Sequence, residues 1–391
     1  MGQRSHAWSD AANPGALAGV RVIDLSRVLE GPLCTQILAD HGADVIKLEP
    51  PKGDETRALG PPFDSDGNAA YFSALNRGKR AASVDLSSAE GRAALERLLE
   101  GADVLVENFL PGTMARWGLN YTALAQRHPR LIYCTITGFG DDGPLGGMPG
   151  YDAVLQAMCG LMSVNGSVES GPTRLGIPIV DHLTGYVALS GILMALHARN
   201  RTGKGQKVEA TLFDTALSLL LPHAANWFYS GQAPGLLGSA HPNICPYDKF
   251  KARDGELFLG VVNDGQFRKL CACIGRADLQ ADPRFATNAL RVEHRDIVRR
   301  ELEATFASLS VAALCADLMA VNVPAGPVNS VPQAFAQPHA QHRAMRVEDG
   351  EYRGMGLPIK FSATPGQPGR RPPRFDEHAE EILGIERRSN S

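Results

Sequence analysis

Short apolar runs alternate with longer helical patterns over the first third of the chain, and this alternation constrains the fold more than any other feature. Strand-like runs lie at residues 20–25, 44–48, 84–86, 103–107 and 131–137, and helical patterns lie at residues 31–41 and 88–99. Strands and helices that alternate at this spacing form βαβ units, whose parallel sheet is covered on both faces. We therefore predict an α/β fold built on a parallel sheet.

The second half of the chain has a different pattern. Residues 151–200 are helical and rich in small side chains, and residues 207–212 resemble one more strand. Gly, Pro and Ala cluster over residues 222–242, so we predict a linker that leads into a second, smaller domain. The elements expected beyond it are strands at 247–251 and 257–262 and helices at 266–274, 311–319 and 377–383. A length of 391 residues allows two cores of this kind.

Composition and charge limit the classes of partner that the chain can be expected to bind. The formal net charge is −3, so no overall positive field attracts the chain to nucleic acid or to an anionic membrane. The 7 Cys are dispersed and the 11 His lack close spacing, which favours reduced thiols in the cytosol and no metal site. Residues 1–16 hold no apolar run, and residues 187–196 are too short to cross a bilayer. We expect a soluble, cytoplasmic protein with a flexible start and no signal peptide.

A glycine-rich segment, residues 138–143, follows a predicted strand and has the letters of a dinucleotide-binding fingerprint. That fingerprint requires a helix immediately afterward, because the first amides of the helix bind the pyrophosphate. Here Pro and Gly residues follow through residue 150, so no helix can begin, and Asp141 and Asp142 repel phosphate. The segment argues against a nicotinamide or flavin site, although its glycines still allow close approach to a ligand.

Asp181 stands between a strand-like apolar run and a long apolar helix. One interpretation is structural, because Asp before a helix is a favoured N-cap worth about 1 kcal/mol. The other is chemical, because a helix N-terminus also stabilises the ionised carboxylate. An ionised, partly buried carboxylate is a competent nucleophile toward a thioester. The residue types alone leave both interpretations open.

Further polar side chains follow the predicted strands at the edge where parallel sheets bind ligands. Asn108, Phe109 and Arg116 come after one strand, and Arg57 lies in the loop after another. Each alone is most often a surface residue, but together they fit a phosphorylated ligand, which Arg binds through paired hydrogen bonds. Tyr151 and the Asp that follows it open the helix before Asp181, where the structural alternative is a cap plus a packed aromatic ring.

The order of the segments resembles the class III coenzyme A transferases, a group that includes formyl-CoA transferase, carnitine CoA-transferase and α-methylacyl-CoA racemase. The matching segments are residues 22–25, 31–32, 42–47, 76–80, 107–109, 111–112, 138–140, 143–144, 150–152, 156–157, 176–185, 202–206, 324–328 and 378–383. No single segment is specific, but the ordered set runs from about residue 17 to residue 386.

The resemblance implies a covalent acyl transfer. The family's catalytic Asp corresponds to Asp181, which attacks an acyl-CoA to form a mixed aspartyl anhydride and to release CoA thiolate. Such nucleophilic catalysis needs no metal or redox cofactor. The positions implied to contact CoA are Val28, Leu29, Asn108, Phe109, Arg116 and, less surely placed, Arg57, with Tyr151 beside them.

The resemblance also implies an architecture. A Rossmann-like large domain is expected from residues 17–221 and 323–391, with the small α+β domain at residues 243–322 between them. Two subunits are expected to interlock as threaded rings, which gives a homodimer.

Departures from the family pattern bear on the reaction. Family racemases carry a His at the position of Tyr151, and a phenol with an ordinary pKa near 10 is a poor base at neutral pH. Formyl-CoA transferases carry a Gln near Leu29, so formate and oxalate are doubtful substrates. Residues 263–267 (Asn-Asp-Gly-Gln-Phe) resemble members that use dicarboxylates with succinyl-CoA, and Pro50 replaces an adenine-stacking Arg of some relatives.

We therefore expect a transferase that moves CoA between a short acyl-CoA and a free carboxylic acid. Two alternatives stay open at this point: an acyl-CoA racemase or epimerase of the same fold, and a non-catalytic CoA-binding protein.

Overall fold

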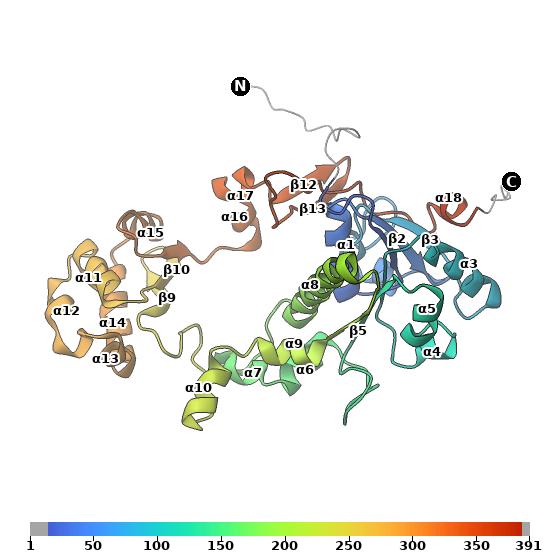
Figure 1. Ribbon diagram of the computed structural model, residues 1–391. Coiled ribbons are helices and arrows are strands. Elements are labelled where there is room, and N and C mark those ends of the chain that lie inside the picture. The colour runs from blue at the N-terminus through green and yellow to red at the C-terminus, as the bar shows by residue number, and fades with distance from the viewer. Residues whose placement is uncertain (1–14, 385–391) are drawn as a thin grey trace. The chain divides into compact units, whose positions relative to one another are not determined.

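The computed structural model describes residues 15–384, which form two compact units (Figure 1). The first unit contains the described residues up to Cys159, Gly176–Leu219 and those from Pro338 onward, and the second contains Gly160–Leu175 and Leu220–Gln337. The first and the last of the described residues therefore belong to the same unit. The predicted linker at residues 222–242 and residues 323–337 fall within the second unit. Of the predicted flexible start, residues 1–14 lie outside the described range.

A six-stranded parallel sheet forms the centre of the first unit. Its strands, in spatial order, are β3 (Arg80–Ser83), β2 (Asp44–Glu49), β1 (Arg21–Asp24), β4 (Val104–Glu107), β5 (Ile132–Thr137) and β8 (Lys207–Thr211). The strand order reverses between β1 and β4, so the carboxyl ends of these two strands open a crevice where such sheets bind ligands. The fold class predicted from the alternating pattern is confirmed.

Helices cover the two faces of this sheet. On one face, α1 (Glu30–Asp40) packs against α8 (Ile179–Thr202), which also contacts β5 and β8. On the other face, Ile23, Ile46 and Leu105 form one apolar core with α3 (Ala89–Leu99) and α18 (Ala379–Leu383). The remaining elements of this unit are η1 (Glu55–Ala58), α2 (Ala70–Ser73), α4 (Thr113–Arg116), α5 (Tyr121–Arg127), α6 (Asp152–Met158), α9 (Leu212–Ser218), α17 (Pro338–His342), β12 (Arg346–Asp349) and β13 (Tyr352–Met355).

Helix α8 is the central helix of the unit. Its 24 residues are long and apolar enough, by length and composition, to cross a membrane, and α14 with α15 pass the same test only as one span bent by 113°. However, α8 buries Val180, Ala188 and Ile192 against the sheet and α1. We therefore describe α8 as a core helix.

The second unit has a small antiparallel sheet, in the order β11 (Ala325–Pro327), β10 (Gly255–Gly260) and β9 (Tyr247–Ala252). Phe250, Leu302 and Phe306 belong to its core. The other elements are α7 (Leu161–Val164), β6 (Gly166–Ser167), β7 (Gly171–Pro172), α10 (His223–Ser230), α11 (Asp264–Cys273), α12 (Ala277–Ala281), η2 (Pro283–Phe285), α13 (Asn288–Glu293), α14 (Arg295–Phe306), α15 (Val311–Ala320) and α16 (Val331–Ala336).

Two local predictions were wrong. The third strand, expected at residues 84–86, is β3 at Arg80–Ser83, whose Ala81 and Ala82 are fully buried although Ala has a low strand preference. Its pairing with β2, a tertiary contact, decides the register. Part of the predicted linker, His223–Ser230, is the helix α10. The sequence analysis also missed α14, although Val298, Leu302 and Phe306 recur at the spacing of an amphipathic helix.

Candidate active site

Asn108 connects the carboxyl ends of β1 and β4 at the point where the strand order reverses. Its side-chain oxygen accepts a hydrogen bond from the backbone N–H of Arg27 at 2.8 Å, and its amide nitrogen donates to the backbone oxygen of Arg27 at 2.7 Å. The next residue, Val28, has a φ of 69°, a left-handed conformation that is unfavourable for a β-branched side chain. Asn108 thus holds a strained turn that leads directly into α1.

Asp181 is the third residue of α8 and is 8% exposed. Pro178 occupies the N-cap position, so the interpretation of Asp181 as a cap is wrong. The cap is supplied by Asp152 of α6, whose Oδ2 accepts hydrogen bonds from the backbone N–H groups of Val180 at 2.8 Å and Asp181 at 3.3 Å. The carboxyl group of Asp181 is therefore not needed to satisfy the helix end.

Gly185 allows α1 to approach α8 beside Asp181. A Cβ atom at Gly185 would lie 2.8 Å from the backbone oxygen of Glu30, too close for any other residue type without a shift. Gly185 is one helical turn beyond Asp181, on the same face of α8. The close approach therefore brings Glu30, the first residue of α1, next to Asp181.

Burial and two neighbouring carboxylates control the charge of Asp181. Burial, followed by the charges of Glu30 and Asp152, raises the pKa of Asp181 to about 8. Burial, with the charges of Asp181, Glu30 and Asp152, also raises the pKa of Tyr71 to about 12. Tyr71, in α2, thus stays protonated and can donate a hydrogen bond. The sequence analysis missed Glu30 and Tyr71 as members of this site, because neither lies in a motif with a chemical signature.

Two buried ion pairs stabilise the turn that follows β1. Lys47 donates to the backbone oxygen of Ser26 at 2.8 Å and pairs with Asp54 at 3.0 Å. Lys79 pairs with Asp24 at 3.0 Å. Burial raises the pKa of Asp24, but Lys79 and Lys47 outweigh burial and lower it to about 2. These charged residues therefore hold the loop in place.

The other residues predicted to contact CoA differ in their surroundings. Leu29 is buried beside Val28, and Phe109 packs edge to face on Trp117 with ring centroids 5.5 Å apart. Arg116 is exposed at the end of α4, where it donates to Thr113 at 3.0 Å. Tyr151 is 72% exposed rather than packed, which corrects the structural alternative for this ring.

Arg57 is held by partners of its own unit. Its guanidinium donates to both carboxylate oxygens of Glu49, at 2.8 and 2.6 Å, and to Asn68 at 2.5 Å. It also stacks over Phe72, with 3.7 Å to the ring centroid. Little of its hydrogen-bonding capacity is left for a phosphate, so its contact with CoA stays a prediction.

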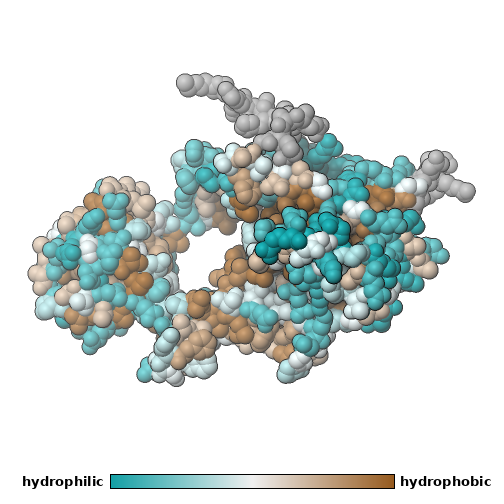
Figure 2. Space-filling model, viewed as in Figure 1, coloured by the Kyte–Doolittle hydropathy of each residue, from teal (hydrophilic) through white to brown (hydrophobic). Residues whose placement is uncertain are grey.

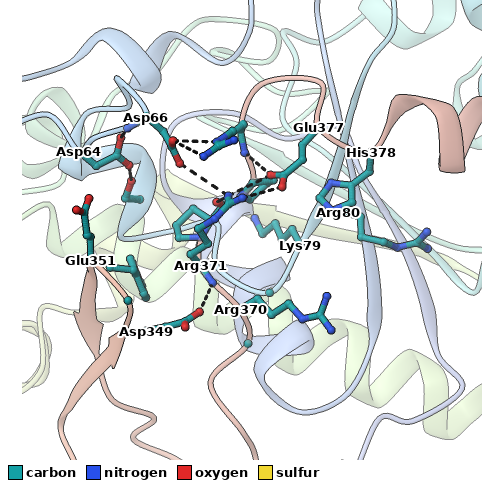
Figure 3. A pocket seen from close by; sticks show the side chains of 18 of the residues that line it. Asp64, Asp66, Lys79, Arg80, Asp349, Glu351, Arg370, Arg371, Glu377 and His378 are labelled. Carbon is teal, nitrogen blue, oxygen red and sulfur yellow. Dashed lines mark hydrogen bonds and ion pairs between the residues drawn. The ribbon is translucent and has the colours of Figure 1, made fainter. Parts of the chain in front are cut away.

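A cavity of the first unit lies at the opposite edge of the sheet, where the strands begin. It has a volume of about 1290 Å³ and is lined by Asp44 and Arg80, which begin β2 and β3, and by residues near the C-terminus (Figure 3). Several of its charged side chains pair with one another: Arg371 pairs with Glu377 at 2.7 Å (Figure 3). Arg374 pairs with Asp66 at 2.8 Å. We assign the cavity no part in the reaction, because ligands of such sheets bind at the carboxyl edge.

A smaller cavity of about 280 Å³ lies beside the carboxyl end of β4 and is lined by Glu107, Phe109, Tyr133 and Lys207 among others. Across residues 15–384, no group of three or more His, Cys, Asp or Glu side chains is arranged to hold a metal ion. The chemistry that the site does offer is a buried carboxyl group at the ligand-binding edge of a parallel sheet. The fold and the site thus define an α/β enzyme that can use a carboxylate as a nucleophile.

Comparison with known proteins gives the family. Residues 17–379 match the model described as CoA-transferase family III, and the chain belongs to this family. It is 43% identical over 378 residues to the succinate–glutarate CoA-transferase of Agrobacterium fabrum, covering 94% of each chain. It is 39% identical over 383 residues to the succinyl-CoA:mesaconate CoA-transferase of Haloarcula hispanica, covering 94% of this chain and 96% of the relative.

A solved structure agrees with this result. The crystal structure of a CAIB/BAIF family protein from Brucella suis has a TM-score of 0.85 and 41% sequence identity, covering 95% of this chain and 99% of that one. The resemblance drawn from the ordered segments is confirmed, and the protein is a CoA transferase.

Proposed function

We propose that the protein transfers CoA between a dicarboxylic acyl-CoA, such as succinyl-CoA, and a free dicarboxylic acid, with Asp181 as the covalent nucleophile. The observation that carries this proposal is the position of Asp181. Its carboxyl group is buried at the start of α8, is not used as a cap, and lies beside the first turn of α1 at the carboxyl edge of the sheet. The names of the two relatives above support dicarboxylic substrates, and residues 263–267 agree with them.

Each step of the proposed reaction forms one bond to an acyl carbon and breaks another. Ionised Asp181 attacks the thioester carbonyl carbon, the C–S bond breaks, and CoA leaves as the thiolate. The thiolate then attacks the aspartyl carbonyl carbon, which releases the donor acid and leaves CoA as a thioester on Asp181. The acceptor carboxylate then attacks the carbonyl carbon of this thioester, which releases the thiolate and forms a new mixed anhydride. The thiolate attacks the acceptor carbonyl carbon of that anhydride, so the new acyl-CoA leaves and the carboxylate of Asp181 is restored. No proton or electron is consumed overall.

The residues around Asp181 are proposed to bind and orient CoA. Val28, Leu29 and Asn108 form the turn beside α1, and Phe109 follows Asn108. Tyr71 remains protonated beside Asp181 and can donate a hydrogen bond to the oxyanion that develops when the thioester is attacked. Arg57, Arg116 and Tyr151 remain candidate contacts to CoA.

We also propose that the protein is a homodimer, interlocked as in the family. Apolar side chains are exposed in both units: Val187, Leu193 and Met194 on α8, and Trp227 and Phe228 on α10. Figure 2 shows that much of the visible surface of α10 is apolar. Exposed apolar patches of this kind mark interaction surfaces. The seven cysteines, none of which forms a disulfide, fit the cytosolic location that we propose.

Mass spectrometry of the intact protein tests the covalent step. The wild type is exposed briefly to succinyl-CoA, and we expect a labile adduct that hydroxylamine traps at Asp181. Asp181→Asn should bind acyl-CoA without forming the adduct. Asp296→Asn is the matched control, because Asp296 also lies in the first turn of a helix but is exposed.

The other outcomes separate the alternatives. Turnover retained in Asp181→Asn would end the proposal. CoA binding with no adduct from any acyl-CoA would favour a binding protein, and deuterium incorporated at the α-carbon in heavy water would favour a racemase.

A further inference from the structure

Lys47 joins the loops that follow two neighbouring strands of the parallel sheet. It lies on β2 opposite Asp24 of β1, and its side chain is fully buried. Its ammonium group donates one hydrogen bond to the backbone oxygen of Ser26, in the turn after β1, at 2.8 Å. It donates another to Oδ2 of Asp54, in the loop after β2, at 3.0 Å. One ammonium group therefore connects both loops.

Each of these contact points is itself fixed within its own loop. Oδ1 of Asp54 accepts hydrogen bonds from the backbone N–H of Thr56 at 3.0 Å and from its hydroxyl group at 2.7 Å, so Asp54 caps η1. In the turn after β1, the backbone N–H of Ser26 donates to Oδ1 of Asp24 at 2.9 Å. Lys47 thus connects two internally hydrogen-bonded loops rather than two flexible side chains.

The two loops carry residues that are proposed to contact CoA. Val28 and Leu29 lie in the turn after β1, and Arg57 lies in η1. A loop that must become ordered when a ligand binds lowers the affinity, so a ligand that contacts both loops binds best when their separation is already set. Lys47 is fully buried and does not reach the ligand itself, but it sets this separation.

Stability alone does not account for the buried pair of Lys47 and Asp54. Desolvation of two buried charges offsets most of their attraction, so such a pair adds little net stability over apolar residues. Arg27 and Glu55 also join the two loops, with 3.5 Å between the charged groups, but their side chains are 35% and 53% exposed. Exposed pairs hold their side chains weakly. The buried ammonium group is thus the connection that fixes the geometry of the loops.

We propose that Lys47 is a positioning residue for CoA binding, which holds the turn after β1 and the loop after β2 at the separation that acyl-CoA requires. The inference rests on the proposed function, because the contacts of Val28, Leu29 and Arg57 with CoA are part of it. Without the ammonium group the two loops move independently. Acyl-CoA then binds more weakly, although Asp181 keeps its place at the start of α8.

Lys47→Met tests this role, because it removes the ammonium group but keeps an unbranched side chain of similar length. We expect KM for succinyl-CoA and Kd for CoA to rise about tenfold, while kcat falls less than about threefold. Arg77→Met is the matched control, because it breaks an equally buried pair of 2.7 Å with Asp40, at the other end of α1. Both variants should lose thermal stability, but only Lys47→Met should lose affinity. Glu55→Gln, which breaks the exposed connection, should leave KM and Kd unchanged.

The results separate a failure of this inference from a failure of the proposed function. An unchanged KM in folded Lys47→Met, or an equal rise in Arg77→Met, would overturn the inference. Transfer retained in Asp181→Asn would instead contradict the proposed nucleophile and leave the result on CoA binding intact. If Lys47→Met does not fold, hydrogen exchange of the wild type gives the answer. CoA should slow the exchange of backbone amides in residues 26–29 and 54–57 together, and protection of one segment alone, or of neither, would overturn the inference.

Discussion

Asp152 caps the helix that carries Asp181, although the two residues lie on different helices, 29 positions apart. One carboxylate oxygen of Asp152 accepts hydrogen bonds from the backbone N–H groups of Val180 and Asp181, at 2.8 and 3.3 Å. The carboxylate that stabilises the helix end is therefore separate from the carboxyl group available for chemistry. This separation lets Asp181 remain buried and uncharged at neutral pH without loss of the cap.

The cap predicts the effect of Asp152→Ala. The variant loses the acceptor for two backbone donors, so we expect the free energy of unfolding to fall by about 1–2 kcal/mol. Transfer activity should also fall, because the first turn of α8 positions Asp181. Thermal unfolding and kcat, measured on the same preparation, check both effects. An unchanged melting temperature would show that other groups satisfy this helix end.

The raised pKa of Asp181 predicts a stability that depends on pH. The folded protein holds the proton of Asp181 up to about pH 8, whereas the unfolded chain releases it near the ordinary value of 3.8. The stabilising effect of this proton is complete below the unfolded value and is lost as pH rises through about 8. Asp181→Asn, which cannot ionise, should therefore be more stable than wild type at alkaline pH, by more than about 1 kcal/mol.

Urea unfolding of both proteins across the pH range measures this difference. The gap in the free energy of unfolding should widen as pH rises and be small in acid. A gap that is the same at every pH would contradict the raised pKa of Asp181.

Close packing at Gly185 predicts the effect of Gly185→Ala. Ala favours a helix by about 1 kcal/mol over Gly, but the added Cβ would lie 2.8 Å from the backbone oxygen of Glu30. The contact is with backbone, which cannot turn away, so we expect α8 to shift and kcat to fall about tenfold or more. Gly235→Ala, where an added Cβ atom meets nothing within 4 Å, should keep full activity.

The buried pair of Lys79 and Asp24 predicts a large loss of stability. Lys79→Met leaves the carboxylate of Asp24 buried and without its ion-pair partner, which should cost about 3–5 kcal/mol. Lys249→Met, which breaks a partly exposed pair with Glu256, should cost less than about 1 kcal/mol. Equal losses in urea unfolding would show that Asp24 finds another partner.

Local patterns in the sequence determined the class of fold. The runs at residues 20–25, 44–48, 103–107 and 131–137 coincide with the strands β1, β2, β4 and β5 to within a few residues, because a buried parallel strand requires a continuous apolar segment. The apolar pattern was insufficient to place β3, because Ala81 and Ala82 form a strand only through their pairing with β2. Asp181 was likewise identified through the order of many segments, because one Asp before a helix can equally be interpreted as an N-cap or as a nucleophile.

The tertiary structure alone decided which groups meet at Asp181. Glu30 and Asp181 come together because α1 and α8 pack on the same face of the sheet and Gly185 has no side chain. Tyr71 and Asp152 reach the same place from two further helices. Charges act through space, and the distance between segments far apart in sequence is set by packing rather than by local pattern. The proposed nucleophile could be named from the sequence, but its protonation state depends on the assembled fold.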